Sequence, residues 1–509
     1  MSKIIISMTK SFAFLAAFVC VLSSFGQSKD VAIYHADKYF EVEDYHNALV
    51  NYRFAVDDSA ILAYDVIPYE ATVTSMKANK KRKPKKGDNF KGSKINYVNH
   101  QIAMCYQLTS DYKMAEEKFL ISKDFPEYPE DQFHYGIALM NNQKYEKALE
   151  ELDAFLESNP TISDSLKDAC LEAISGCFYA KQAQENPREV KLKMADTAIF
   201  NRGTSSFGVR YFGSEDRVTF TSARDSGVIL KPEQESKFLC DVYWVEKSEE
   251  AWKPAENFGR PLNSAQHDAA ACWDNGNTLF YCRWSDESKD VKIHLIRMKD
   301  FLFYESFVLP EPINQEGYKT QHPFVTKDGK KMYFSSNIPG GFGGFDIWET
   351  ALDSIGNPIG ELKNLGPVIN TVNDEVTPFY HRAASTFYFS SNGHNSIGGL
   401  DVFKSFYNKK ADTYKKIENL GVPLNSSNDD AYLIWDEKLQ KGFLSSDREP
   451  CDNGHCYDIY EVTNEPIVIA LNGNSYDKDS EETIDDVQLT FKDIDGEFKP
   501  FEMLTDTEG

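Results

Sequence analysis

The chain has 509 residues, a formal net charge of −24 at pH 7 and 13% aromatic residues. This length exceeds what one hydrophobic core supports, so we expect roughly two to four domains. The excess of negative charge disfavours nucleic acid or an anionic membrane surface as a general partner.

The N-terminus, residues 1–26, is typical of a secretory signal peptide. Two lysines precede an apolar run over residues 11–22, and the small residues of SSFGQ follow it. Cleavage near Gly26 would export the protein and remove Cys20. The alternative is lipidation of Cys20, which requires a small preceding residue where this chain has Val19. We therefore expect ordinary cleavage and export.

Residues 28–186 have a helical pattern with an internal repeat. Ala48, Ala115 and Ala148 occupy matching helix-turn-helix positions, 67 and 33 residues apart. The pattern resembles the tetratricopeptide repeat, in which small residues let paired helices approach, although the signature Trp is absent. We expect an α-solenoid that binds partners and is capped by a helix over residues 164–184. An ordinary helical bundle is the alternative.

A basic segment interrupts this region. KANKKRKPKKGDNFKGSK, residues 77–94, has nine basic residues in an otherwise acidic protein. Pro84 and two glycines oppose a long helix, so we expect an exposed loop. It is either an electrostatic contact for an acidic partner or a solvated insertion, and we prefer the second interpretation.

A glycine-rich motif then recurs about every 55 residues. FSSNIPGGFGGFDIW, FSSNGHNSIGGLDVF and LSSDREPCDNGHCYDIY each run from Ser-Ser through a loop to Asp, an aliphatic residue and an aromatic residue. FTSARD with LCDVYWV is a further copy, and a weaker one surrounds Asp290. A period of about 50 residues with several strands per unit indicates a β-propeller. We expect five blades over about 203–463, in a domain of residues 195–463, with six blades as the alternative.

The Asp of each strong copy is expected to be structural. In this interpretation the glycines supply positive φ in a tight turn, and the Asp accepts backbone N–H bonds there. Binding of a ligand or metal is the less favoured alternative. The expected turn residues are Asp241, Asp346, Asp401 and Asp458.

A second motif precedes each unit and shares a Gly, a Pro and an Asn. An acid follows the Asn by five residues, at Asp268, Glu375 and Asp430. Together these residues resemble the WD40-like propeller repeat called PD40, which is related to the propeller of the periplasmic protein TolB. The match covers about residues 203–462, and the copy around Asp290 departs from it because its loop lacks glycines.

The fifth copy has two cysteines, in CDNGHC, where the other copies have glycines. A turn at Asn453-Gly454 would bring Cys451 and Cys456 within disulfide range, and export permits oxidation. We therefore expect a disulfide between them. Cys170 and Cys177 lie seven residues apart on an expected helix and should stay free. No CxxC pair is present, so we expect no structural zinc site.

Residues 464–509 alternate apolar and polar positions and contain Gly- and Asp-rich turns. They resemble the opening strands of a carboxypeptidase-regulatory-like β-sandwich. So few strands cannot close a sandwich, and we expect the natural protein to continue. The acidic turn over residues 477–482 fits no EF-hand loop and is expected to be solvated.

Hydrolase, metalloprotease and nucleotide-binding motifs are absent from the sequence, including GxSxG, HExxH, the P-loop and the Rossmann fingerprint. We therefore expect no catalytic residues, no cofactor and no metal, and a protein that is not an enzyme. His267, His322 and His381 lie in related parts of successive blades. They either converge on the propeller axis or are scattered, and we prefer the second interpretation.

The order of these regions resembles the PorE-type proteins of Bacteroidota. The resemblance implies a periplasmic protein at the outer membrane, associated with the type IX secretion and gliding machinery and with β-barrel partners of the PorP/SprF type. Family members usually end in an OmpA-like domain that binds peptidoglycan, which these residues do not include. The expected function is a non-catalytic scaffold linking an outer-membrane complex to the cell wall. The alternative is a solute- or glycan-binding propeller in nutrient uptake.

Overall fold

The computed structural model divides into two compact units, residues 1–464 and 465–509. It describes residues 29–42, 44–56, 93–224, 239–249, 251–274, 277–284, 290–300, 302–449, 456–464, 473–491 and 501–506. The expected signal peptide, nearly all of the basic segment and the loop after the second strand of the second blade lie outside the described residues.

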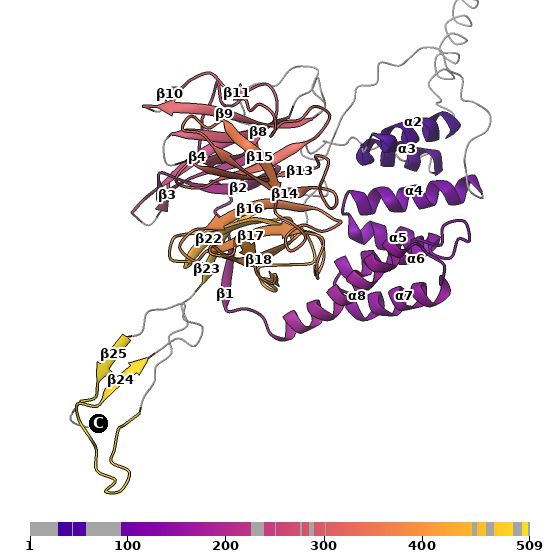
Figure 1. Ribbon diagram of the computed structural model, residues 1–509. Helices are drawn as coiled ribbons and strands as arrows, with labels where there is room; N and C mark the ends of the chain where they lie inside the picture. Colours follow the sequence, from indigo (N-terminus) through magenta and orange to yellow (C-terminus); the bar gives the residue numbers. More distant parts are fainter. Residues whose placement is uncertain are drawn as a thin grey trace, which may run out of the picture. The chain divides into compact units, whose positions relative to one another are not determined.

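The described part of the N-terminal region is helical, as predicted. It contains α2 (Lys29–Glu41), α3 (Tyr45–Val56), α4 (Lys94–Leu108), α5 (Tyr112–Ser122), α6 (Asp131–Asn141), α7 (Tyr145–Ser158) and α8 (Asp164–Glu185). Each of these helices packs against the next along the chain (Figure 1). The predicted last helix, over residues 164–184, corresponds to α8.

Small residues set the spacing of the helices, and side-chain caps set where several of them begin. Ala48, Ala115 and Ala148 are fully buried. A Cβ on Gly136 of α6 would lie 2.7 Å from Leu152 of α7, so only Gly permits this approach. The side chains of Ser93, Asp111 and Ser163 accept N–H bonds at the starts of α4, α5 and α8.

Five antiparallel sheets follow, so the prediction of a five-bladed β-propeller is confirmed. The first blade has β2 (Ser205–Phe212), β3 (Ser214–Ala223), β4 (Cys240–Ser248), β5 (Ala251–Trp252) and β6 (Glu256–Asn257). The second has β7 (Asp268–Trp273), β8 (Thr278–Trp284), β9 (Val291–Lys299), β10 (Leu302–Phe303) and β11 (Phe307–Val308). The third has β12 (Thr320–Val325), β13 (Lys331–Ser336), β14 (Asp346–Leu352) and β15 (Pro358–Asn364).

The fourth blade has β16 (Glu375–His381), β17 (Thr386–Ser391), β18 (Asp401–Asn408), β19 (Thr413–Tyr414) and β20 (Glu418–Asn419). The fifth has β21 (Asp430–Trp435), β22 (Lys441–Ser446), β23 (Asp458–Asn464) and β1 (Val190–Met194). The innermost strands β2, β7, β12, β16 and β21 contact one another in a closed ring. Side chains from the innermost, middle and third strands of the blades form the largest hydrophobic core among the described residues.

Strand β1 precedes the first blade in the sequence but belongs to the fifth blade, and in this way it closes the ring. It pairs antiparallel with β23, with Leu192 opposite Val462, and it connects α8 to the first blade (Figure 1). It lies ahead of the expected domain start at residue 195. Its lysines Lys191 and Lys193 are exposed, which is typical of a protected sheet edge.

The second unit contains a hairpin of β24 (Gln488–Phe491) and β25 (Phe501–Leu504) and a bridge between Tyr476 and Thr483. The start of a β-sandwich is not confirmed by these elements. In the described part of the chain, no helix combines the length and the apolar character needed to cross a membrane.

Candidate functional site

The Asp that begins the third strand occupies the same place in four blades. Each is paired in its sheet with the second Ser of the preceding motif: Ser222 with Asp241, Ser336 with Asp346, Ser391 with Asp401, and Ser446 with Asp458. In the second blade the corresponding pair is Arg283 and Lys292, so Lys292 occupies this place and the predicted Asp290 lies two residues before it. These positions are therefore equivalent by rotation about the propeller axis.

Asp346 and Asp401 accept hydrogen bonds within the glycine-rich turns. Asp346 accepts from the N–H groups of Phe342, at 2.7 Å, and Gly343, at 3.1 Å. Asp401 accepts from the N–H of Ile397 at 2.8 Å. These contacts hold the turn against the start of the third strand. The turns that precede Asp241 and Asp458 lie largely outside the described residues.

A further asparagine, which the sequence analysis missed, joins the Asp to the Asn of the second motif. In the fourth blade the side-chain amide of Asn419 donates to the Asp401 carboxylate at 2.6 Å. The side-chain oxygen of Asn419 accepts from the Gly421 N–H and from the Asn425 side chain, both at 2.7 Å. The same contacts are made in the first and third blades by Asn257 and Asn364. The signal was an Asn recurring six residues before the motif Asn.

The motif Asn is hydrogen-bonded in both directions to the backbone of the third strand. Asn425, 1% exposed, accepts from the Val402 N–H at 2.8 Å and donates to its carbonyl at 2.9 Å. The equivalent pairs are Asn201 with Ile459, Asn263 with Val242, Asn314 with Ile293, and Asn370 with Ile347. Because buried backbone groups require partners, these asparagines stabilise every blade.

The glycines ahead of the Asp let one blade approach the next. A Cβ on Gly343 would overlap the carbonyl group of Val372, and a Cβ on Gly398 would overlap that of Ser427. Both carbonyls belong to the segment that enters the following blade. Gly340 has a φ of 96°, whereas Gly343 and Gly398 do not have positive φ. Close packing between blades therefore explains these two glycines, and the predicted left-handed conformation does not.

The acids of the second motif begin the innermost strands and are fully buried. Glu375 accepts from the N–H and hydroxyl of Thr371, both at 2.7 Å, and from the Ser391 hydroxyl at 2.8 Å. Burial raises the pKa of Glu375 to about 7, although these bonds oppose the shift. Burial likewise raises the pKa of Asp268 to about 6, against the opposing effect of Arg283.

Each innermost strand contains a bulge at the same position. The sheet register shifts there in all five blades. The residues with positive φ at these bulges are Gly208 (69°), Ala270 (50°), His322 (55°), Thr377 (51°) and Tyr432 (57°). Four of them carry side chains, and such a conformation costs about 1–3 kcal/mol per residue. The closed ring of strands therefore imposes this geometry around the axis.

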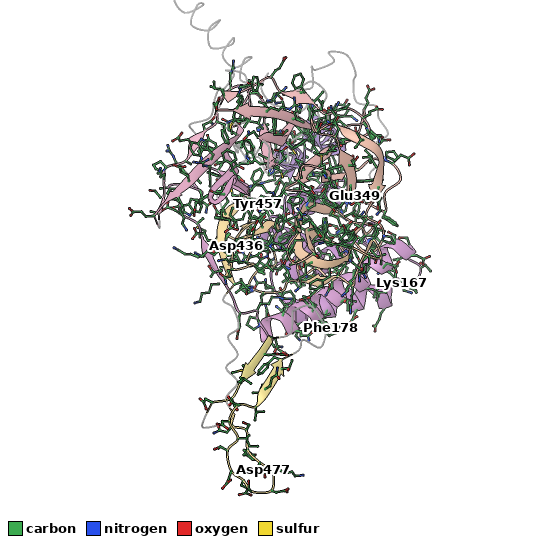
Figure 2. The ribbon with its side chains drawn as sticks, turned by 60° about the vertical axis from the view of Figure 1, so that its left-hand side comes forward. Lys167, Phe178, Glu349, Asp436, Tyr457 and Asp477 are labelled. Carbon is green, nitrogen blue, oxygen red and sulfur yellow. The ribbon has the colours of Figure 1, made fainter. Side chains whose placement is uncertain are left out.

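A cavity of about 770 Å³ lies where the innermost strands begin. All five innermost strands contribute to its wall, through Ser205, Ala269, Gln321, Val376 and Ala431. The helical region supplies the opposite wall, including Phe133, Ile137 and Met140 of α6 and Glu172 and Ala173 of α8. Tyr457, labelled in Figure 2, also lines the cavity. We call this space the axial cavity.

The helical region is held against this end of the propeller by direct contacts. Gln143 donates to the Ser427 hydroxyl at 3.2 Å, and the Tyr179 hydroxyl donates to the Asn419 carbonyl at 3.0 Å. Ile397, in the glycine-rich loop of the fourth blade, is 1% exposed and packs into the helical core. The helical region and the propeller therefore pack against each other within one compact unit.

Two of the three histidines noted in the sequence line the axial cavity. His267 accepts the Cys240 N–H through Nδ1 at 3.1 Å. His322 is 6% exposed and lies edge-on to the Tyr432 ring, with 5.3 Å between ring centroids. Burial lowers the pKa of His267 to about 4 and that of His322 to about 3. His381 instead bonds backbone atoms away from the cavity.

The cysteines divide into free and bonded thiols. Cys170 and Cys177 are free and buried in α8. Cys456 is disulfide-bonded, while Cys451 lies outside the described residues, so the pairing of these two stays a prediction. Within the described ranges, no group of three or more His, Cys, Asp or Glu side chains is arranged to hold a metal ion.

Comparison with known proteins finds distant structural neighbours only. No family model matches the chain, and no curated protein matches it. A solved glycoside hydrolase is 10% identical with a TM-score of 0.37, over 58% of this chain and 97% of that one. GH43B of the Bacteroides ovatus xyloglucan PUL is 11% identical with a TM-score of 0.34, over 61% and 56%. A puromycin-hydrolyzing peptidase of Mycobacterium tuberculosis is 12% identical with a TM-score of 0.28, over 47% and 35%.

These neighbours correct the expectation that the chain is not an enzyme. They are named as glycoside hydrolases and a peptidase, and the absence of hydrolase motifs does not by itself decide whether this chain is an enzyme. The chain spans 35% and 56% of the lengths of the peptidase and the GH43B protein. At these identities and TM-scores the likeness assigns no activity to this chain.

Proposed function

We propose that this chain is a periplasmic scaffold that links an outer-membrane protein complex to the cell wall. The resemblance to PorE-type proteins supports the proposal. The structural observation that carries it is the packing of the helical region onto the propeller as one unit. A partner bound to the helices is then held in a set position relative to the propeller.

The helical region would act as a tetratricopeptide-like solenoid. Its support is the serial packing of the helices around the fully buried Ala48, Ala115 and Ala148. Since the propeller covers parts of α6 and α8, we assign the partner contact to exposed apolar residues elsewhere on the helices. Leu120 and Ile121 of α5 are each 54% exposed, and adjacent exposed apolar side chains mark interaction surfaces. Residues 464–509 would begin the β-sandwich that the resemblance implies.

Co-expression with an outer-membrane β-barrel protein of the PorP/SprF type tests this function. The tagged chain should retain the barrel after detergent extraction and affinity purification. The double variant L120D/I121D should lose at least about tenfold of the retained barrel, because charge at the contact must be desolvated. The control L302D/F307D changes residues that are 72% and 55% exposed on the edge of the second blade and should retain the barrel.

Two outcomes would contradict the proposal in different ways. Failure of the unaltered chain to retain any barrel protein overturns the scaffold function. Full retention by L120D/I121D, with loss in L302D/F307D, moves the contact from the helices to the propeller. Both pairs are exposed, so circular dichroism should show that all variants stay folded.

A second candidate function, binding of a solute or glycan, is favoured by the axial cavity. Its volume of about 770 Å³ falls in the range of about 300–1,000 Å³ that small-molecule sites occupy. All five blades converge on it, which gives a ligand many points of contact. A saturable small ligand of the purified chain would support this candidate.

A further inference from the structure

Part of the wall of the axial cavity consists of residues with a strained backbone conformation. Three of the bulge residues with positive φ line the cavity, namely His322, Thr377 and Tyr432. Gly208 holds the equivalent position in the first blade, which shows that the ring accepts a residue without a side chain there. The closed ring imposes this conformation in every blade, so it shapes the wall of the cavity and does not by itself indicate a ligand.

His322 carries a polar atom that the protein itself leaves unsatisfied. Its side chain is 6% exposed and lines the axial cavity, and its Nδ1 has no hydrogen-bond partner among the described residues. The backbone N–H of the same residue is satisfied, since it donates to Cys282 Sγ at 3.3 Å. A buried polar atom without a partner costs about 1–3 kcal/mol, so this imidazole is a polar group of the wall whose hydrogen bonding the protein leaves incomplete.

The other imidazoles of the cavity offer neutral donors and acceptors. His267 accepts through Nδ1, so in its neutral form Nε2 carries the proton and is a donor. His394 contacts the Ile369 carbonyl through Nε2 at 3.1 Å, so its Nδ1 is an acceptor. Burial lowers the pKa of His267, His322 and His394, and all three are therefore uncharged at neutral pH.

The charged side chains of the lining disfavour an anion and leave little free charge for a cation. Lys319 is basic, whereas Glu172, Asp374 and Asp429 are acidic. The carboxylates already have partners: Asp374 accepts the Phe345 N–H at 2.7 Å, and Asp429 accepts the Leu400 N–H at 2.7 Å. Glu172 faces the Asn373 amide at 3.4 Å.

Aromatic side chains complete the lining. Phe133 contributes from the helices, and Trp284, Phe345, Tyr432 and Tyr457 contribute from the blades. Flat apolar faces beside amide, hydroxyl and imidazole groups match a ligand that has C–H faces and a rim of hydroxyls. A sugar ring has this combination, and the cavity volume accommodates a short chain of such rings.

We propose that the axial cavity binds a neutral oligosaccharide and that the His322 imidazole in its wall contributes to recognition of this ligand. This inference rests on the second candidate function. It adds the chemical class of the ligand and the residue that recognises it. It does not depend on the scaffold role.

The test is calorimetric titration of the full chain with trisaccharides of similar size and different charge. Neutral probes are N,N′,N″-triacetylchitotriose, cellotriose, xylotriose and maltotriose. The anionic probe is the galacturonic acid trimer, and the cationic probe is the glucosamine trimer. At least one neutral probe should bind saturably and at least about tenfold more tightly than both charged probes.

Two glycine variants test the role of His322. H322G removes the imidazole and installs the residue that the first blade has naturally, so it should stay folded and weaken binding at least about tenfold. The control A270G acts at the equivalent bulge of the second blade, where Ala270 does not line the cavity, and should leave affinity unchanged. Thermal unfolding of both variants checks the fold.

Each outcome decides a separate point. Tighter binding of a charged trimer overturns the ligand class while leaving a small-ligand site in place. Equal affinity of H322G and the unaltered chain overturns the role of His322. Failure of every probe to bind overturns both this inference and the second candidate function.

Discussion

Replacement of Asn425 by Ala should show how strongly the repeated asparagines stabilise the propeller. The side chain is 1% exposed and makes hydrogen bonds to both backbone groups of Val402 and to Asn419. The Val402 carbonyl also accepts the Leu420 N–H at 3.0 Å, so it keeps a partner in the variant. In the variant, the Val402 N–H is therefore the backbone group that loses its hydrogen bond to the Asn425 side chain without keeping another partner named here.

The magnitude follows from that buried donor. An unsatisfied buried N–H costs about 1–3 kcal/mol, and the lost bond to Asn419 and the space left by the amide add about 1 kcal/mol. Asn425→Ala should therefore lower the free energy of unfolding by about 3 kcal/mol. Asn370→Ala should lower it by a similar amount, because Asn370 makes the same bonds to Ile347 in the third blade.

Urea unfolding followed by tryptophan fluorescence measures this loss, because the midpoint shift multiplied by the common slope gives the difference in free energy. Asn408→Ala is the matched control. Asn408 accepts two backbone N–H bonds in an exposed turn, and water replaces them at a cost below about 1 kcal/mol. A loss in Asn425→Ala within about 0.5 kcal/mol of the control would refute the reasoning.

Three other predictions concern packing, pH and covalent structure. Gly398→Ala places a Cβ against the Ser427 carbonyl and should cost about 1–3 kcal/mol, seen as a lower calorimetric midpoint; an unchanged midpoint would contradict the tight blade contact. Because burial raises the folded-state pKa of Glu375 from 4.5 to about 7, the folded state binds more protons between these values. The contribution of Glu375 to stability is complete below about pH 4.5 and is lost as the pH rises through about 7. The free energy of unfolding should therefore fall across this window, and Glu375→Gln should flatten the curve. Mass spectrometry of the unreduced exported protein should find Cys451 joined to Cys456, and free thiols at both would disprove the pairing.

The sequence alone was sufficient for the architecture of the two repeat regions. The copies ending in Asp241, Asp346, Asp401 and Asp458, with the weaker copy at Asp290, predicted five blades, and five sheets form the blades of the propeller. Alanines at helix-turn-helix spacing predicted the helical region. These features are readable because a repeat places the same residues at the same contact in each copy, so local contacts leave a periodic signal.

The tertiary structure alone decided how these regions close and meet. Strand β1 has no motif of its own, because an edge strand needs only a register that fits β23. The glycines at 343 and 398 are explained by carbonyl groups that approach from the following blade. His267 and His322 are 55 residues apart in the sequence, and ring closure brings both to one cavity that the helices cover. Such contacts depend on the positions of whole blades and helices relative to each other, which no local pattern of residues specifies.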